Sequence, residues 1–252
     1  MSIRIDLIKR SNNWFNPKFL LEHLYELSQR SYTEKTIYLA PYLVSGESVT
    51  PKIAGPVVEN LIKKLEASDT GYMIILREKE ITVIKPPLPF TMDAIVEGDD
   101  TGLLEDIFDK NVTIGIVLIR LGRYAVAVFE RENIVVSKTS TRHVKNRHRA
   151  GGSSQRRFER SRERLIRELF DKTCEVTREL FDPFTNEIKY VFFGGEKHTV
   201  RGFQNRCDYI SNMDAHVLSR LLNIEAPNQK TIESISKEIY RSQVSTYEIV
   251  NQ

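Results

Sequence analysis

The spacing of apolar positions predicts a mixed α/β region over the first 100 residues. Two amphipathic helices are predicted, over residues 16–30 and 55–67, the first opened by Asn16-Pro17 because proline fits the first turn of a helix. Runs rich in Ile, Val and Tyr predict strands over residues 36–40, 71–76 and 80–85. The proline-rich run and the acidic residues that follow, between 85 and 100, break regular structure. We place the first domain boundary there.

The second part of the chain shows a different order of elements. Three short β segments with tight turns between them predict an antiparallel meander over residues 112–120, 123–130 and 133–138. A long amphipathic helix is predicted over 155–181. A buried strand is then expected at 190–193, shorter helices over roughly 197–221, and a last amphipathic helix from 229 to about 247.

Length and composition are those of an ordinary globular protein. The chain has 252 residues, of which 40% are hydrophobic and 28% charged, so one or two domains with a real core are expected. The longest apolar stretch, at 114–119, is far shorter than the roughly 18 residues that a membrane helix needs. With no apolar signal segment at the N-terminus either, we expect a cytoplasmic protein. Cys174 and Cys207 are too few for a disulfide framework or a four-cysteine zinc site, and we interpret both as small buried side chains.

The charge is unevenly distributed. The formal net charge is +3, but residues 138–168 carry eleven Lys or Arg against three Glu, a local excess of +8. The rest of the chain therefore sums to −5. Because phosphate neutralisation is a local contact effect, this pattern indicates a polyanionic partner that contacts the basic segment.

The basic segment contains the tract TSTRHVKNRHRAGGSSQRRFERSRER, residues 139–164. The adjacent glycines Gly151 and Gly152 let the backbone approach a ligand without interference from Cβ atoms. Such a tract is often only a solvated loop whose charges aid solubility. Here three features favour a binding function: most of the cationic excess, a position directly before the longest helix, and a β meander that holds the base of the loop.

The order of these features resembles a known family. Three β segments, a basic loop with Gly-Gly, Gln and Arg-Phe-x-Arg, a long Arg-rich helix and an apolar strand ending in Gly-Gly resemble the middle domain of eukaryotic and archaeal peptide-chain release factors. Within that superfamily the chain is most similar to the Vms-type release factors, in a compact prokaryotic form. These free nascent chains from stalled large ribosomal subunits.

The resemblance implies an α+β fold and a division of the chain. The catalytic domain, residues 108–225, would have an RNase-H-like mixed sheet with the long helix after the Gly-Gly loop. A smaller N-terminal α/β region, residues 1–100, matches no module that we name, and residues 226–252 would form a C-terminal amphipathic helix.

The resemblance also implies the site. Release factors place glutamine directly after the two glycines, where this chain has Ser153, but the Vms-type branch displaces its glutamine downstream. Gln155 is then the functional equivalent, and it would position water on the ester of peptidyl-tRNA while Gly151 and Gly152 allow close approach. Cations on both sides would clamp ribosomal RNA and the tRNA acceptor end: Lys145, Arg147, Arg149, Arg156, Arg157 and Arg160.

Our leading hypothesis is a ribosome-rescue peptidyl-tRNA hydrolase. Its partners would be the large ribosomal subunit, ribosomal RNA and peptidyl-tRNA, with no membrane, cofactor or metal, and the protein would be a monomer. Two alternatives stay open. One is a nuclease that cleaves the tRNA 3′ end with His143 and His148 as general acid and base, although histidines in such tracts more often only contact phosphate. The other is a non-catalytic ribosome-binding factor.

Overall fold

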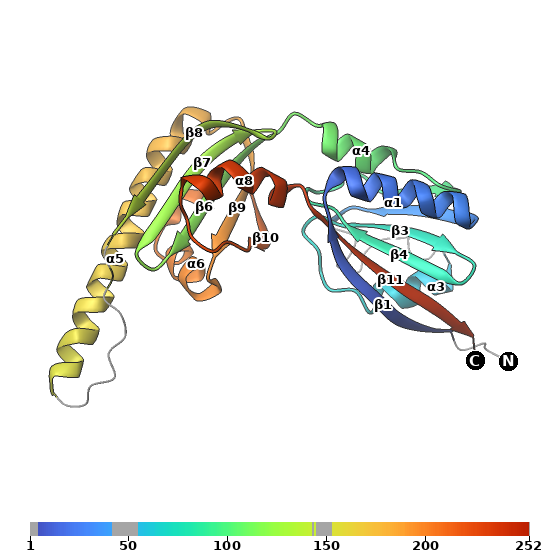
Figure 1. Cartoon of the computed structure of the whole chain (residues 1–252), viewed down its shortest axis with the longest axis horizontal. Helices are drawn as coiled ribbons and strands as arrows, with labels where there is room; N and C mark the ends of the chain where they lie inside the picture. Colours follow the sequence, from blue (N-terminus) through green and yellow to red (C-terminus); the bar gives the residue numbers. More distant parts are fainter. Residues whose placement is uncertain (1–4, 42–54, 143, 145–152, 252) are drawn as a thin grey trace. The chain divides into compact units, whose positions relative to one another are not determined.

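The computed structural model describes residues 5–41, 55–142, 144 and 153–251 (Figure 1). The chain forms two compact units. The N-terminal unit comprises Met1–Lys110 together with Lys237–Gln252, and the central unit comprises Asn111–Ser236. The predicted α+β class is confirmed.

The N-terminal unit is a six-stranded antiparallel sheet with helices on both faces. Its strand order is β1 (Ile5–Phe15), β11 (Ser242–Asn251), β4 (Glu80–Lys85), β3 (Tyr72–Arg77), β2 (Thr33–Leu39) and β5 (Ala94–Glu97). All six residues of β3 are buried. Figure 1 shows α1 (Pro17–Arg30) and α3 (Pro56–Ile62) on opposite sides of this sheet, which accounts for burial on both faces of the strand.

The first helix forms where the sequence predicts it. Its N-cap, Asn16, accepts a hydrogen bond from the backbone N–H of Phe19 at 2.9 Å, and Pro17 occupies the first helical position. Leu20 and Leu24 are the buried residues of its apolar stripe. The second predicted helix is shorter than expected, because α3 ends at Ile62.

The C-terminal segment differs from the prediction. Only Gln229–Ile239 is helical (α8), and the chain then enters β11 instead of continuing as a helix to 247. In β11 the strand-forming residues Val244 and Thr246 pair with β1 on one side and β4 on the other. Both partners lie more than 150 residues away in sequence, so the local apolar spacing carries no information about this pairing.

The boundary expected between residues 85 and 100 is also displaced. Residues 94–97 form β5, which pairs with β2, and α4 (Gly102–Asp109) still belongs to the N-terminal unit. Thr36 and Tyr38 hold this segment to the sheet by donating hydrogen bonds to the carbonyl oxygens of Gly98 and Asp100, both at 2.8 Å. The proline and acidic residues therefore mark a connection within the unit.

The central unit is built on a five-stranded mixed sheet. Its order is β10 (His216–Leu222), β9 (Ile188–Gly195), β6 (Thr113–Arg120), β7 (Arg123–Glu130) and β8 (Asn133–Thr141). The predicted meander of β6, β7 and β8 is antiparallel, whereas β9 and β10 run parallel to β6. This is the mixed sheet that the resemblance implied. One expectation is wrong, because residues 216–222 form β10 where a short helix was predicted.

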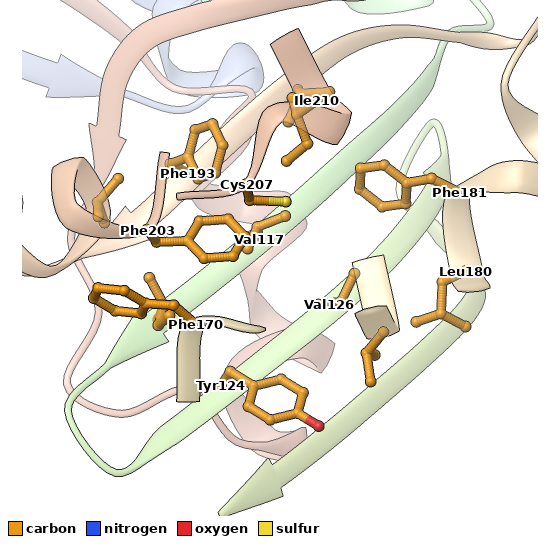
Figure 2. Close-up of a cluster of buried hydrophobic side chains, with 14 of the residues drawn as sticks. Val117, Tyr124, Val126, Phe170, Leu180, Phe181, Phe193, Phe203, Cys207 and Ile210 are labelled. Carbon is orange, nitrogen blue, oxygen red and sulfur yellow. The ribbon is translucent and has the colours of Figure 1, made fainter. Parts of the chain in front are cut away.

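The core of the central unit lies between the sheet and the long helix α5 (Ser153–Phe181) (Figure 2). Val117, Tyr124 and Val126 of the sheet face Phe170, Leu180 and other apolar residues of α5. The helix α6 (Lys197–Gln204) and the short α7 (Asp208–Ser211) complete the cluster through Phe203 and Ile210.

The two cysteines are paired, which corrects their interpretation as separate buried thiols. Cys174 on α5 forms a disulfide with Cys207, which directly precedes α7, and the two Cα atoms are 5.6 Å apart. The bond joins elements 33 residues apart in sequence. It therefore ties the middle of α5 to the helices beside it.

Two glycines with positive φ, Gly195 at the end of β9 and Gly122 between β6 and β7, yield the first prediction. Gly195 has φ +126° and a Cβ there would lie 2.1 Å from the carbonyl oxygen of Ile119, whereas Gly122, at φ +93°, has its nearest neighbour at 3.5 Å. Alanine at Gly122 should cost about 1–2 kcal/mol of stability through backbone strain alone. Gly195→Ala adds a backbone clash and should lower the unfolding temperature further. Thermal unfolding of the two variants checks this, and equal effects would contradict it.

The position of β11 yields the second prediction. Ending the chain after Arg241 removes the strand between β1 and β4, so β1 loses its only partner in the described sheet. We expect the N-terminal unit to lose amide-exchange protection in β1 and β4, while the β6–β7 hairpin of the central unit keeps it. Amide hydrogen exchange on both chains is the measurement. Unchanged protection in β4 would show that β11 is dispensable.

Candidate nucleic-acid interface on the long helix

Only some of the predicted site residues lie in the part of the chain that the structure describes. Those of the loop lie outside the described residues: His143, Lys145, Arg147, His148, Arg149, Gly151 and Gly152. Ser153 begins α5. Gln155, Arg156, Arg157 and Arg160 all lie on the first turns of that helix.

The first half of α5 extends away from the sheet, as Figure 1 shows. None of the residues from Gln155 to Glu168 is buried, and Leu169 is the first buried residue of the helix. From Ser153 to Leu169 a helix rises about 24 Å, at 1.5 Å per residue. The sequence explains this, because RRFERSRER offers no apolar stripe for packing. We call residues 153–168 the arm.

The arm is strongly basic along one side. It carries six arginines and three glutamates. Arg156, Arg160, Arg164 and Arg167 follow one another at helical spacing and are all exposed. Of the three glutamates, Glu168 lies 3.6 Å from Arg164, with both side chains about half exposed or more. Exposed pairs of this kind stabilise little, so the guanidinium groups can exchange carboxylate for phosphate.

Gln155 has a defined contact on the first turns. Its side-chain nitrogen donates a hydrogen bond to Glu159 Oε1 at 3.0 Å. This uses one of the two N–H donors of the amide, and the amide oxygen is an acceptor on the same group. Glu159 was absent from the predicted site. Glu159 follows Gln155 by four residues on the predicted helix, and this spacing is the sequence signal that indicates the contact.

The second half of α5 holds the arm. Leu169, Val176, Leu180 and Phe181 are buried in the central core. At the surface, Lys138 of β8 lies 2.8 Å from Glu179, and this hydrogen-bonded carboxylate raises the pKa of Lys138.

Two further links brace this half of the helix. Arg206 donates to Asp171 at 2.7 Å, and the acceptor raises the pKa of Arg206. The Cys174–Cys207 disulfide lies in the same segment. A helix fixed along half its length can hold its other half in solvent with a defined direction from the unit that carries it.

The second Gly-Gly pair has a structural explanation. Gly194 and Gly195, which could suggest a nucleotide loop, allow β9 to approach Leu118 and Ile119 of β6. Within the described parts of the chain, no three His, Cys, Asp or Glu side chains gather as a metal site. Among the same residues, no helix is both long and apolar enough to span a membrane.

Known proteins share parts of this sequence. The chain is 32% identical over 100 residues to peptide chain release factor subunit 1 of Methanosphaera stadtmanae, which covers 40% of this chain and 24% of the relative. With the protein of the same name from Archaeoglobus fulgidus it shares 26% identity over 179 residues, 65% of this chain and 43% of the relative. The chain therefore spans less than half the length of these curated relatives.

Two solved structures align with parts of this chain at low similarity. The crystal structure of the archaeal translation termination factor aRF1 aligns with 90% of this chain and 73% of its own, at 17% identity and a TM-score of 0.41. The Vms1 mitochondrial localization core aligns with 68% of this chain and 74% of its own, at 10% identity and a TM-score of 0.39. Because both TM-scores are below 0.5, the assignment rests on sequence.

One family matches the central unit and its arm as a whole. The sequence model described as Actinobacteria/chloroflexi VLRF1 release factor matches residues 112–245, more than half of the chain. The match begins one residue before β6 and includes α5 and α8. The resemblance to release factors that the Gly-Gly tract and the long helix suggested is thereby confirmed. The chain belongs to the Actinobacteria/chloroflexi VLRF1 release factor family.

Proposed function

We propose that this protein is a ribosome-rescue release factor that hydrolyses the peptidyl-tRNA ester on stalled large ribosomal subunits. The observation that carries the proposal is the release-factor family match over the unit that bears the arm. In this proposal, Gln155 and the preceding glycines act in the peptidyl-transferase centre. Ribosomal RNA and the tRNA acceptor end are the polyanions that the arginines contact.

The geometry of the arm supports this proposal. A peptidyl ester in a ribosome is enclosed by RNA, so a protein must bring its reactive group there on a narrow projection. A single helix of about 10 Å diameter, extending about 24 Å beyond its first buried residue, meets that requirement. Exposed arginines along the arm make favourable contacts with phosphate on the way in.

The reaction needs no titratable side chain at the centre. Water adds to the ester carbonyl carbon, the bond to the tRNA ribose oxygen breaks, and the products are a peptide acid and a tRNA with a free hydroxyl. The side-chain amide of Gln155 can accept a hydrogen bond from the attacking water, which fixes its position. A backbone N–H near Gly152 would donate to the oxygen on which negative charge develops.

The contact between Gln155 and Glu159 gives the proposal a structural detail. The 3.0 Å hydrogen bond from its nitrogen to Glu159 favours one orientation of the Gln155 amide. Restricting the side chain in this way lowers the entropy lost when it positions water. Glu159 is thus a positioning residue in the proposal, one turn removed from the reacting atoms.

The first test concerns chemistry. Gln155→Ala should retain folding and binding to stalled large subunits while lowering peptide release by about 10²- to 10³-fold, the loss seen when one such polar contact is removed. Gln204→Ala, an exposed glutamine on α6 of the same unit, is the matched control and should release peptide normally. The assay follows both the released peptide and the tRNA 3′ end.

Its outcomes separate the competing hypotheses. Release that leaves the tRNA 3′ end intact and depends on Gln155 supports ester hydrolysis. A shortened tRNA, with activity that depends on His143 or His148, would contradict ester hydrolysis and support the nuclease hypothesis. Tight binding with no release by the unaltered protein would leave only a ribosome-binding factor.

The second test concerns the arginines. Replacing Arg156, Arg157 and Arg160 by Ala should weaken binding to large subunits and reduce the slope of log affinity against log salt, because fewer counterions are released. A triple change at Lys18, Lys63 and Lys79, all exposed in the N-terminal unit, removes the same charge elsewhere and is the control. Affinities at several salt concentrations are the measurement. An equal loss in both variants would mean that only net charge matters.

A further inference from the structure

The N-terminal unit contains a pocket that the proposed function does not use. It has a volume of about 420 Å³ and lies on the face of the six-stranded sheet that α3 covers in part. The helix has only seven residues and packs Val58 and Leu61 into the core beneath it. The pocket lies beyond this helix, with β1, β11 and β4 as its floor.

The strand register brings polar side chains to the floor. Gln243 is opposite Lys85, and Ser245 is opposite Asn12. Because side chains alternate along a strand, Gln243, Ser245 and Tyr247 point to one face of β11. A register shift between Lys9 and Ser11 in β1 places Lys9 and Asn12, three residues apart, on that same face.

Three lysines from separate elements line the pocket. Lys9 lies on β1, Lys85 ends β4, and Lys64 follows α3. Lys64 Nζ donates to the carbonyl oxygen of Leu7 at 3.3 Å, and Lys9 Nζ lies 6.0 Å from the centre of the Tyr247 ring. These contacts leave further N–H groups on each ammonium for a ligand, since each has three donors.

The balance of charge in the pocket favours an anion. Among the lining residues the three ammonium groups face one carboxylate, that of Glu66. Asp69, which is not among the lining residues, lies 4.0 Å from Lys85 and offsets part of its charge. The pocket lining therefore carries a local excess of positive charge, although the residues of the chain outside 138–168 sum to −5.

The neutral groups of the pocket add donors. The hydroxyl of Ser245 donates to Asn12 Oδ1 at 3.0 Å, so that the oxygen of the Asn12 amide is engaged and its N–H groups remain as donors. Lysine on β1 alone would need no explanation, because charged residues protect edge strands from pairing. Lys64 and Lys85 do not serve that purpose, since neither lies on the edge strand.

We propose that this pocket binds the phosphate group of a nucleotide, with the lysines on the phosphate and Asn12 and Gln243 beside the sugar or base. Phosphate offers several acceptor oxygens to a site rich in donors. The volume of about 420 Å³ exceeds that of a phosphate ion and falls within the range of small-ligand pockets, roughly 300–1,000 Å³. The nucleotide is either free or the 5′-phosphorylated end of an RNA strand, and both supply the same terminal phosphate group.

The test uses the whole chain and needs no ribosome, so its result is independent of the proposed function. AMP and adenosine are titrated by calorimetry, and a short oligoadenylate is titrated with and without a 5′ phosphate. We expect AMP or the phosphorylated strand to bind at least tenfold more tightly than its unphosphorylated counterpart. Binding of AMP identifies a free nucleotide, whereas binding of the strand alone identifies RNA.

Matched variants locate the binding. Lys64→Gln should weaken it about tenfold, because a hydrogen bond to a charged group is lost. Lys63→Gln, at the adjacent exposed position outside the pocket, should not weaken it. If Lys64→Gln unfolds, Lys9→Gln on the exposed edge strand replaces it. Equal binding of adenosine and AMP with no preference for a phosphorylated strand, no binding at millimolar concentrations, or an equal loss in Lys63→Gln would overturn the proposal.

Discussion

The packing of the second half of α5 onto the five-stranded sheet is the interaction on which the candidate site depends. Leu169, Val176, Leu180 and Phe181 are buried against the sheet, and burying such side chains contributes about 1.5–3 kcal/mol each. The arm has no comparable burial between Gln155 and Glu168. Its helical order therefore relies on continuing a helix whose nucleation is already provided by the packed half.

The two halves of α5 therefore require different kinds of residue. Apolar residues at helical spacing provide anchorage from Leu169 onward, and the residues before them are free to be selected for charge. Two contacts support the anchored half. The Lys138–Glu179 ion pair lies at its surface, and the Cys174–Cys207 disulfide lies beside the core.

The N-terminal unit solves a different problem. Its sheet is completed by β11, which lies between β1 and β4 but follows the whole central unit in sequence. The two edge strands of this sheet are held differently. Hydrogen bonds from Thr36 and Tyr38 hold the chain that follows β5, whereas β1 pairs along ten positions with β11, its only partner among the described strands. The proposed phosphate pocket lies where this late strand meets β1 and β4. Its lining thus combines residues from both ends of the chain.

The sequence by itself determined the helix at Asn16-Pro17, the meander of β6, β7 and β8 and the long helix, because each is encoded by caps, turns and apolar spacing within a few residues. It also determined the basic arm and the family. Only the tertiary structure decided that residues 242–251 form a strand, that Cys174 and Cys207 pair, and that Lys9, Lys64 and Lys85 line one pocket. Each of these depends on residues far apart in sequence, whose contacts are selected by the packing of the whole unit and leave no local pattern.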